Sequence, residues 1–267
     1  MTTRVAIIGA GGRMGQAMIR AVQTGTVRDL SISAAVERPD FGALGSDAGA
    51  AGKLGVCFTA DVAAAAGASD AMIDFSFHTN TAEHARIASQ SGVALVVGTT
   101  GMSADEEGMV REAAKKIPVV FSANMSLGMN LLFSLVRQAS KALADKGYDV
   151  EIIERHHRRK KDAPSGSAVS LAKAAADGLG WDLNRVAVHG RSGLVGERPG
   201  EQIGIHAVRG GDIVGDHTVL FAAEGECLEL SHRATSRETF AMGALRAAAW
   251  ASGRKPGLYS MKDVLEL

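Results

Sequence analysis

The sequence is poor in cysteine, proline and aromatic residues, and its 29 basic and 29 acidic side chains cancel. Its two cysteines, Cys57 and Cys227, stand far apart with no CxxC motif or histidine cluster beside them, which disfavours a disulfide framework and a metal site. A net charge of zero gives no reason to expect nucleic acid or a membrane surface as a partner. No apolar run reaches the roughly eighteen residues that a membrane-spanning helix needs.

A strand-like segment begins at Arg4, immediately after the start of the chain, so we expect no signal peptide. Together with the scarcity of cysteine, this predicts a cytoplasmic protein with reduced thiols and no metal.

The first half of the chain alternates apolar runs with segments of helical periodicity. The apolar runs predict buried strands at 4–8, 31–36, 71–75, 93–97 and 119–121. The periodic segments predict helices at 14–22, 81–90 and 103–115. Continuous apolar strands separated by helices are typical of a parallel sheet covered on both faces. We therefore expect an α/β domain with a parallel sheet over residues 1–126.

After residue 126 the pattern changes to a long helix followed mainly by strands. Leu127–Leu143 predicts one helix, 149–154 a strand, and 166–177 a second helix. Strand-like runs without a helix between them follow at 185–188, 203–208, 217–222 and 227–231. This order predicts a second α+β domain over residues 127–235, with a mostly antiparallel or mixed sheet. Two helices cover only one face of such a sheet, so we expect a partner subunit on the other.

The C-terminal region contains one more helix signal. Thr235, Ser236, Arg237 and Glu238 have the T-x-x-E form of a capping box, which predicts a helix that begins there and runs to about Ala251.

A glycine-rich turn, Gly9 to Gly15, lies between the first strand and the first helix. Glycines there let backbone N–H groups and a helix N-terminus meet a pyrophosphate. The spacing is G-x-x-G-x-x-G, and the strict G-x-G-x-x-G pattern would place Met14 at the third glycine; a plain tight turn is the alternative. An acidic residue at the end of the second strand, Glu37, favours the dinucleotide interpretation.

The pair Glu37 and Arg38 bears on which cofactor is used. A carboxylate at that strand end accepts hydrogen bonds from ribose hydroxyls and favours NAD, whereas an arginine suits the 2′-phosphate of NADP. An exposed ion pair is the alternative. The dinucleotide interpretation predicts that both NADH and NADPH are accepted.

Two further loops follow the carboxyl ends of strands, at Gly98–Thr100 and at Ser122–Met125. Ligands of open α/β sheets bind in the crevice outside those ends. Ordinary strand-to-helix loops are the alternative.

A basic cluster follows the strand of the second domain, with seven basic or imidazole side chains among the eight residues 155–162. Pro164, Ser165, Gly166 and Ser167 then lead into a helix, and Ser165 or Ser167 is available as its cap. A helix N-terminus beside lysine and histidine is an anion site that suits a small substrate with carboxylates, and a histidine can supply a proton. A solvated loop, a nucleic-acid patch and a metal site are the alternatives.

The stretch Glu151–Ala168, E-I-I-E-R-H-H-R-R-K-K-D-A-P-S-G-S-A, closely resembles the signature of the 4-hydroxy-tetrahydrodipicolinate (dihydrodipicolinate) reductase family. Other pieces agree in order: V-A-I-I-G-A-G-G-R-M-G near the start, G-S-D-A-G at Gly45–Gly49, V-G-T-T-G at Val97–Gly101, and R-G-G-D-I-V-G-D-H-T at Arg209–Thr218. The resemblance runs from about residue 4 to the C-terminus.

The resemblance implies a Rossmann-type dinucleotide-binding domain completed by residues 236–267, a substrate-binding and oligomerisation domain, and a homotetramer. It implies NADH- or NADPH-dependent reduction of a small cyclic dicarboxylate in lysine and diaminopimelate biosynthesis. His156 would be the general acid, Lys160 the charge-stabilising group, and His157, Gly166 and Ser167 would bind a substrate carboxylate. The implied cofactor residues are Gly9, Ala10, Gly11, Gly12, Arg13, Met14, Glu37, Arg38, Gly98, Thr99, Thr100, Ser122, Ala123, Asn124 and Met125.

Three positions depart from the family pattern. Met125 stands where phenylalanine is common, Phe77 where some members have arginine, and Ser167 where threonine is usual. Two other functions share parts of this pattern. A regulator that senses NAD(H) needs the glycine turn but not His156 with Lys160, and a dehydrogenase of the aspartate or homoserine type shares the first domain alone.

Overall fold

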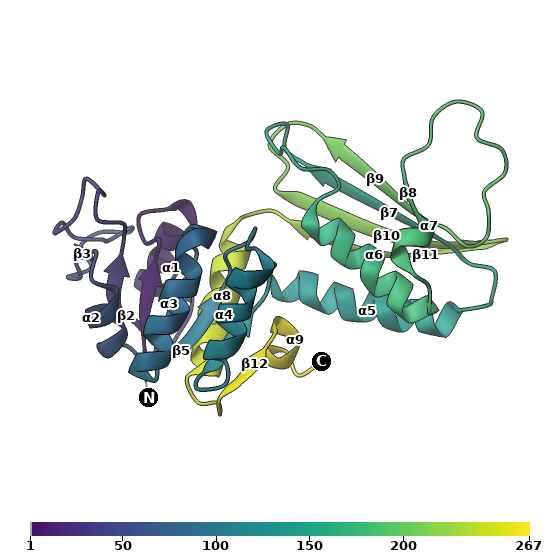
Figure 1. Cartoon of the computed structure of the whole chain (residues 1–267). Coiled ribbons are helices and arrows are strands. Elements are labelled where there is room, and N and C mark those ends of the chain that lie inside the picture. The colour runs from purple at the N-terminus through teal and green to yellow at the C-terminus, as the bar shows by residue number, and fades with distance from the viewer. Residues whose placement is uncertain (1) are drawn as a thin grey trace. The chain divides into compact units, whose positions relative to one another are not determined.

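The computed structural model describes residues 2–267, which form two compact units. The N-terminal unit contains the chain up to Leu127 together with Arg237–Leu267, and the central unit contains Gly128–Ser236 (Figure 1). No helix among the described residues has the length and hydropathy to cross a membrane.

The N-terminal unit is built on a seven-stranded parallel sheet in the order β12-β6-β5-β4-β1-β2-β3, as the Rossmann-type prediction requires. Its strands are β1 (Thr3–Ile8), β2 (Leu30–Val36), β3 (Phe58–Thr59), β4 (Ala71–Asp74), β5 (Ala94–Val97), β6 (Pro118–Phe121) and β12 (Gly257–Tyr259). Its helices are α1 (Arg13–Gln23), α2 (Val62–Gly67), α3 (His78–Ser91), α4 (Ala104–Ala113), α8 (Glu238–Ala251) and α9 (Met261–Val264).

Both faces of this sheet are covered, because alternate residues of each strand enter different cores. In β1, Val5 and Ile7 pack with α1 and α8, whereas Ala6 and Ile8 pack with α2, α3 and α4. A strand buried on both faces needs apolar residues at every position, which is why the sequence shows continuous rather than alternating runs.

The C-terminal helix differs from its prediction at one end. It ends at Ala251 as expected, but it begins at Glu238, and its N-cap is Arg237, which makes no side-chain cap hydrogen bond. The predicted capping box is therefore wrong: Glu238 is the first helical residue and follows the N-cap directly, whereas such a box requires it at the third helical position.

The central unit has a mixed five-stranded sheet in the order β11-β10-β7-β9-β8. Strands β10 and β11 pair antiparallel, as do β10 and β7, whereas β7, β9 and β8 pair parallel. Its elements are α5 (Leu127–Leu143), β7 (Asp149–His156), α6 (Gly166–Leu179), α7 (Leu183–Val186), β8 (Ala187–His189), β9 (Ile203–Arg209), β10 (Gly215–Ala223) and β11 (Glu226–Ala234).

The strand expected at 185–188 is a second correction. Residues up to Val186 belong to the short helix α7, which Asp182 caps by accepting a hydrogen bond from the backbone N–H of Asn184. Only Ala187 and Val188 extend into β8. Capping by Asp182 thus outweighed the β-branched residues that suggested a strand.

Helices α5 and α6 lie on one face of this sheet, as Figure 1 shows, and their apolar side chains pack on Val150 and Ile152 of β7. Because side chains alternate along a strand, Glu154 and His156 point to that same covered face and are buried. One strand therefore carries both core residues and two ionisable groups toward the helices.

The glycine spacing of the first turn follows from packing. A Cβ on Gly15, in the first turn of α1, would lie 2.4 Å from the carbonyl oxygen of Gly9 and 2.5 Å from Cα of Ala10. The position that must be glycine is therefore Gly15, because α1 contacts the turn at this residue, whereas the next position toward the N-terminus holds Met14.

We predict that Gly15→Ala lowers the free energy of unfolding by about 1–3 kcal/mol, because the added methyl forces α1 away from the turn. Gly108→Ala is the matched control: Gly108 lies in α4 with nothing within 4 Å of an added Cβ. That control should gain roughly 0.5–1 kcal/mol from helix propensity. Urea denaturation measures both, and equal stability of Gly15→Ala and the wild type would contradict the packing argument.

Candidate active site

The turn between β1 and α1 requires glycine at its first position. Gly9 has φ +79°, and a Cβ there would lie 2.7 Å from the carbonyl oxygen of Phe75. A side chain at Gly9 would therefore be strained and would collide with the residue that follows β4. The bare turn leaves backbone N–H groups and the start of α1 accessible to an anion.

Glu37, at the end of β2, is tied to this turn. Its Oε1 accepts a hydrogen bond from the backbone N–H of Gly11 at 2.9 Å, and its Oε2 accepts one from the backbone N–H of Arg38 at 3.2 Å. The Arg38 guanidinium is exposed and pairs with Asp40 at 2.8 Å. The ion pair considered from the sequence is thus formed by Arg38 with Asp40 and not with Glu37.

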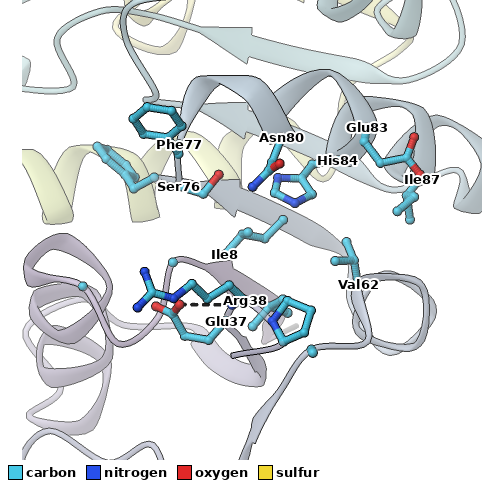
Figure 2. Close-up of a pocket in the computed structure, with 16 residues that line it drawn as sticks. Ile8, Glu37, Arg38, Val62, Ser76, Phe77, Asn80, Glu83, His84 and Ile87 are labelled. Carbon is cyan, nitrogen blue, oxygen red and sulfur yellow. Dashed lines mark hydrogen bonds between the residues drawn. The ribbon is translucent and has the colours of Figure 1, made fainter. Parts of the chain in front are cut away.

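A cavity of about 480 Å³ opens beside the turn. Figure 2 shows Glu37 and Arg38 on one side of it and Asn80 and His84 of α3 on the other. Phe77 also lines it and is 64% exposed, so its ring is available to stack. Sequence reasoning missed the α3 residues, although their position directly after a strand end was a usable signal.

A buried carboxylate organises the strand ends next to this cavity. Asp74, the last residue of β4, accepts hydrogen bonds from Nδ1 of His84 at 2.8 Å and from both the backbone N–H and the hydroxyl of Ser76. Thr99 donates its hydroxyl to Asp74 from the loop after β5. Burial alone disfavours the ionised form, but the bonds from His84 and Ser76 outweigh it and hold the pKa of Asp74 below its usual value.

A second cavity of about 320 Å³ collects residues from separate segments of the N-terminal unit. It is lined by Arg13, Met14, Phe75, Gly98, Ala123, Asn124, Met125, Arg237 and Phe240. The last two come from the start of α8 and were not predicted, because nothing in a helix start by itself indicates which cavity it faces.

The remaining predicted cofactor residues differ in their exposure to solvent. Ala10 and Thr99 are buried, and Thr100 is exposed. Ser122 donates its hydroxyl to the carbonyl of Asn124 at 2.8 Å and so shapes that loop. The residues that line neither cavity are Ala10, Gly11, Thr99, Thr100 and Ser122.

The central unit holds the predicted acid and anion-binding residues. Ser165 is the N-cap of α6, its hydroxyl accepting a bond from the backbone N–H of Ala168 at 3.2 Å. This decides between Ser165 and Ser167 as the cap. Gly166 and Ser167 are then the first two residues of α6, where the positive end of the helix dipole lies.

Glu154 lies at the centre of this site and is fully buried. Its carboxylate accepts bonds from Nδ1 of His156 at 2.6 Å and from the backbone N–H of Ser165 at 2.9 Å. Arg209 of β9 adds a two-pronged contact at 2.7 and 2.8 Å. Burial opposes ionisation, but these hydrogen bonds outweigh it and hold the pKa of Glu154 below its usual value.

His217 of β10 packs edge-on against the His156 ring, with ring centroids 5.2 Å apart. Its Nε2 lies 3.2 Å from the hydroxyl of Ser165. Burial, reinforced by repulsion from His156, lowers the pKa of His217 to about 4, so its ring is neutral at pH 7.

The cationic side chains of the basic loop differ in their exposure to solvent. The Lys160 ammonium is mostly buried and pairs with the Asp162 carboxylate at 2.8 Å. His157 is half-buried, and the exposed side chains fit the solvated-loop interpretation: Arg158, Arg159 and Lys161. The loop thus contributes Lys160 as its one sheltered ammonium.

Two family models match nearly the whole of this chain. The model described as dihydrodipicolinate reductase, N-terminus, matches residues 3–125, and the one described as dihydrodipicolinate reductase, C-terminus, matches residues 128–265. The chain belongs to the dihydrodipicolinate reductase family. It is an oxidoreductase, and reductases of this family use NADH or NADPH through the N-terminal unit.

Individual relatives agree with the family assignment. A 4-hydroxy-tetrahydrodipicolinate reductase of Anaeromyxobacter dehalogenans is 52% identical and covers 99% of this chain and 98% of its own. A 4-hydroxy-tetrahydrodipicolinate reductase of Anaeromyxobacter sp. (strain Fw109-5) is also 52% identical, and the match covers 98% of this chain and 97% of that protein. The solved dipicolinate-bound dihydrodipicolinate reductase of Paenisporosarcina sp. TG-14 superimposes with a TM-score of 0.77 and is 25% identical. The match covers 98% of this chain and 99% of that structure.

Proposed function

We propose that this reductase converts 4-hydroxy-tetrahydrodipicolinate to tetrahydrodipicolinate. The observation that carries the proposal is the arrangement of His156: Glu154 holds its Nδ1 directly beside the start of α6. The curated relatives carry this activity in their names, and the related structure binds dipicolinate, a planar dicarboxylate. A proton donor next to an anion-binding helix start suits a substrate of that class.

The residues of the N-terminal unit fit a nicotinamide dinucleotide. The bare turn at Gly9 would hold the pyrophosphate, and Glu37 and Arg38 would hold the adenosine ribose. The second cavity, with Asn124 and Met125, would hold the nicotinamide. When bound, the cofactor supplies a hydride to C4 of the substrate ring.

His156 supplies the matching proton. Loss of water from the 4-hydroxy imine leaves a C=C bond conjugated to C=N, so addition at C4 sends the charge to the ring nitrogen. Because Nδ1 of His156 is committed to Glu154, its Nε2 is the atom that delivers the proton. His156 is 9% exposed, so this exchange is sheltered from bulk water.

Lys160 and the start of α6 would bind the two substrate carboxylates. The backbone N–H groups of Gly166 and Ser167 carry the positive end of the helix dipole, with His157 alongside. An ammonium has three donors, so Lys160 retains one for substrate while two face Asp162. One such donor contributes about 2.7–4 kcal/mol when it meets developing charge.

We predict that His156→Gln lowers kcat by roughly 10²–10⁴-fold, because the proton donor is lost. Lys160→Ala should lower kcat by a similar factor, and both variants should bind NADH nearly as the wild type does. The assay generates the substrate in situ from pyruvate and aspartate semialdehyde and follows NADH absorbance, with fluorescence titration for cofactor binding. Near-normal turnover in both variants would refute these roles.

Arg38 is proposed to recognise the 2′-phosphate of NADPH, since its guanidinium is exposed at the cavity and pairs only with the exposed Asp40 among the described residues. We predict that Arg38→Ala raises KM for NADPH at least about tenfold more than KM for NADH. Arg111→Ala, an exposed arginine of α4 paired with Glu107, is the control and should change neither. An equal loss for both cofactors would show that Arg38 does not read the phosphate.

The face of the central sheet opposite α5 and α6 supports a homo-oligomer, which we propose to be a tetramer; only Arg191 and Arg198 of the segment between β8 and β9 contact Glu151 there among the described arginines. Leu220 points to this helix-free face, where it is paired in register with Glu151 of β7 and Glu229 of β11. Sedimentation at micromolar concentration should give the mass of a tetramer, and Leu220→Glu should lower it by charge repulsion. A monomeric mass for the wild type would contradict this proposal.

A cytoplasmic location is also part of the proposal. Cys57 and Cys227 are exposed and unpaired, as suits a reducing compartment. Cell fractionation tests it, and recovery of the chain from an extracytoplasmic fraction would refute it.

A further inference from the structure

The stretch Arg209–Thr218 has no part in the proposed chemistry, yet it surrounds the proton donor. Arg209 contacts Glu154, Gly215 lies against Nε2 of His156, and His217 packs on the His156 ring. These residues lie on β9 and β10, the two strands that flank β7. The sheet therefore brings them to the proton donor from both sides.

The Glu154 carboxylate has all its acceptor positions occupied. Its Oε1 accepts from the backbone N–H of Ser165 and from Arg209, and its Oε2 accepts from Nδ1 of His156 and from Arg209. Two carboxylate oxygens offer about four lone-pair sites. If Glu154 were protonated, its own O–H group would point at one of these four N–H donors. This arrangement therefore accommodates the ionised form.

The saturated carboxylate fixes which nitrogen of His156 carries a proton. Because Oε2 of Glu154 only accepts, Nδ1 of His156 must be the donor, both when the ring is charged and when it is neutral. The proton exchanged with substrate is then the one on Nε2. A rotated or alternative tautomer would leave a buried carboxylate oxygen facing a bare ring nitrogen, which is strongly unfavourable.

Gly215 keeps the Nε2 side of the ring open. A Cβ at this position would lie 3.0 Å from Nε2 of His156. Gly215 is not one of the glycines with a positive φ, so its backbone conformation does not require glycine. The close approach to the imidazole is therefore the physical reason for glycine at the start of β10.

Arg209 contributes charge as well as two hydrogen bonds. It neutralises the buried Glu154, and the same guanidinium donates to the backbone carbonyl of Asp162 at 2.7 Å. Asp162 is the residue whose carboxylate pairs with Lys160. One side chain thus links the partner of His156 to the loop that carries the ammonium.

We propose that Glu154 and Arg209 are positioning residues of the reductase: Glu154 holds His156 with Nδ1 protonated and Nε2 facing substrate, and Arg209 sets how strongly Glu154 retains the proton on that ring. This inference rests on the proposed role of His156 as the acid. The ionisable groups around His156 and its neighbour His217 are Glu154 on β7, Arg209 on β9, His232 on β11, and Lys160 and Asp162 in the loop.

Glu154→Gln is the first test. The amide keeps an oxygen that accepts from Nδ1 but loses the charge that stabilises the protonated ring. We expect kcat to fall about 10- to 100-fold, within the range for general-acid catalysis. The alkaline limb of the kcat pH profile should move about one to two pH units lower, because a lost opposite charge lowers proton affinity.

Arg209→Met should move the same limb the other way. Without the guanidinium, Glu154 acts on the imidazole with its full charge, so this limb of the kcat profile should move about one pH unit higher. Arg209→Lys retains the charge but not the two-pronged contact, so it should lower kcat while leaving the limb in place. Opposite shifts from two partners of one ion pair are not produced by a merely structural defect.

Two control variants make the same kinds of substitution at positions away from His156. Glu226→Gln removes a carboxylate that bonds Tyr148 at the other end of the central sheet, and Arg4→Lys alters an arginine fork on Asp70 in the N-terminal unit. Both should leave the pH profile unchanged. NADH binding by fluorescence should be intact in every variant, which reports on the N-terminal unit, and thermal denaturation reports on the folding of the central unit, which carries Glu154 and Arg209.

The outcomes separate the two claims. A wild-type chain without turnover refutes the proposed function before any variant is compared. Normal wild-type turnover with unmoved limbs in Glu154→Gln and Arg209→Met overturns the positioning roles alone. If Arg209→Met does not fold, Glu154→Gln and Arg209→Lys still decide, since equal pH profiles for these two variants contradict the inference.

Discussion

A single buried carboxylate, that of Glu154, joins the parts of the central unit on which the chemistry depends. An uncompensated charge in that position would be strongly destabilising, so its four donors are required together. They come from β7 itself, from β9 and from the start of α6. Meeting this electrostatic requirement therefore places the proton donor, the anion-binding helix start and the lysine loop in one arrangement.

The N-terminal unit uses the same device at its own strand ends. Asp74 is buried at the end of β4, and hydrogen bonds from His84, Ser76 and Thr99 satisfy it. These contacts join α3 to the loop after β5, both of which border the proposed cofactor site. In each unit, a buried carboxylate near the end of a strand thus joins neighbouring elements through its hydrogen bonds.

The sequence predicted most where a pattern is local. Continuous apolar runs predicted the parallel sheet, and the run through His156 and Lys160 indicated the chemistry. Glu154 was within reach as well, because residues two apart on a strand share a face. Arg209 was not, since it lies 55 residues from Glu154 and only strand pairing joins them. The capping box and the strand at 185 failed because Arg237 and Asp182, not the expected residues, begin those helices.

The most direct test of the account is the tautomer of His156 in the wild-type chain. Histidine-selective ¹⁵N spectra, recorded as a function of pH and assigned with His156→Gln, report which ring nitrogen carries the proton. The account predicts that, once the ring is neutral, Nδ1 remains protonated and Nε2 is bare. A neutral ring protonated on Nε2 with Nδ1 bare would contradict it, because Glu154 could not then hold the donor in place.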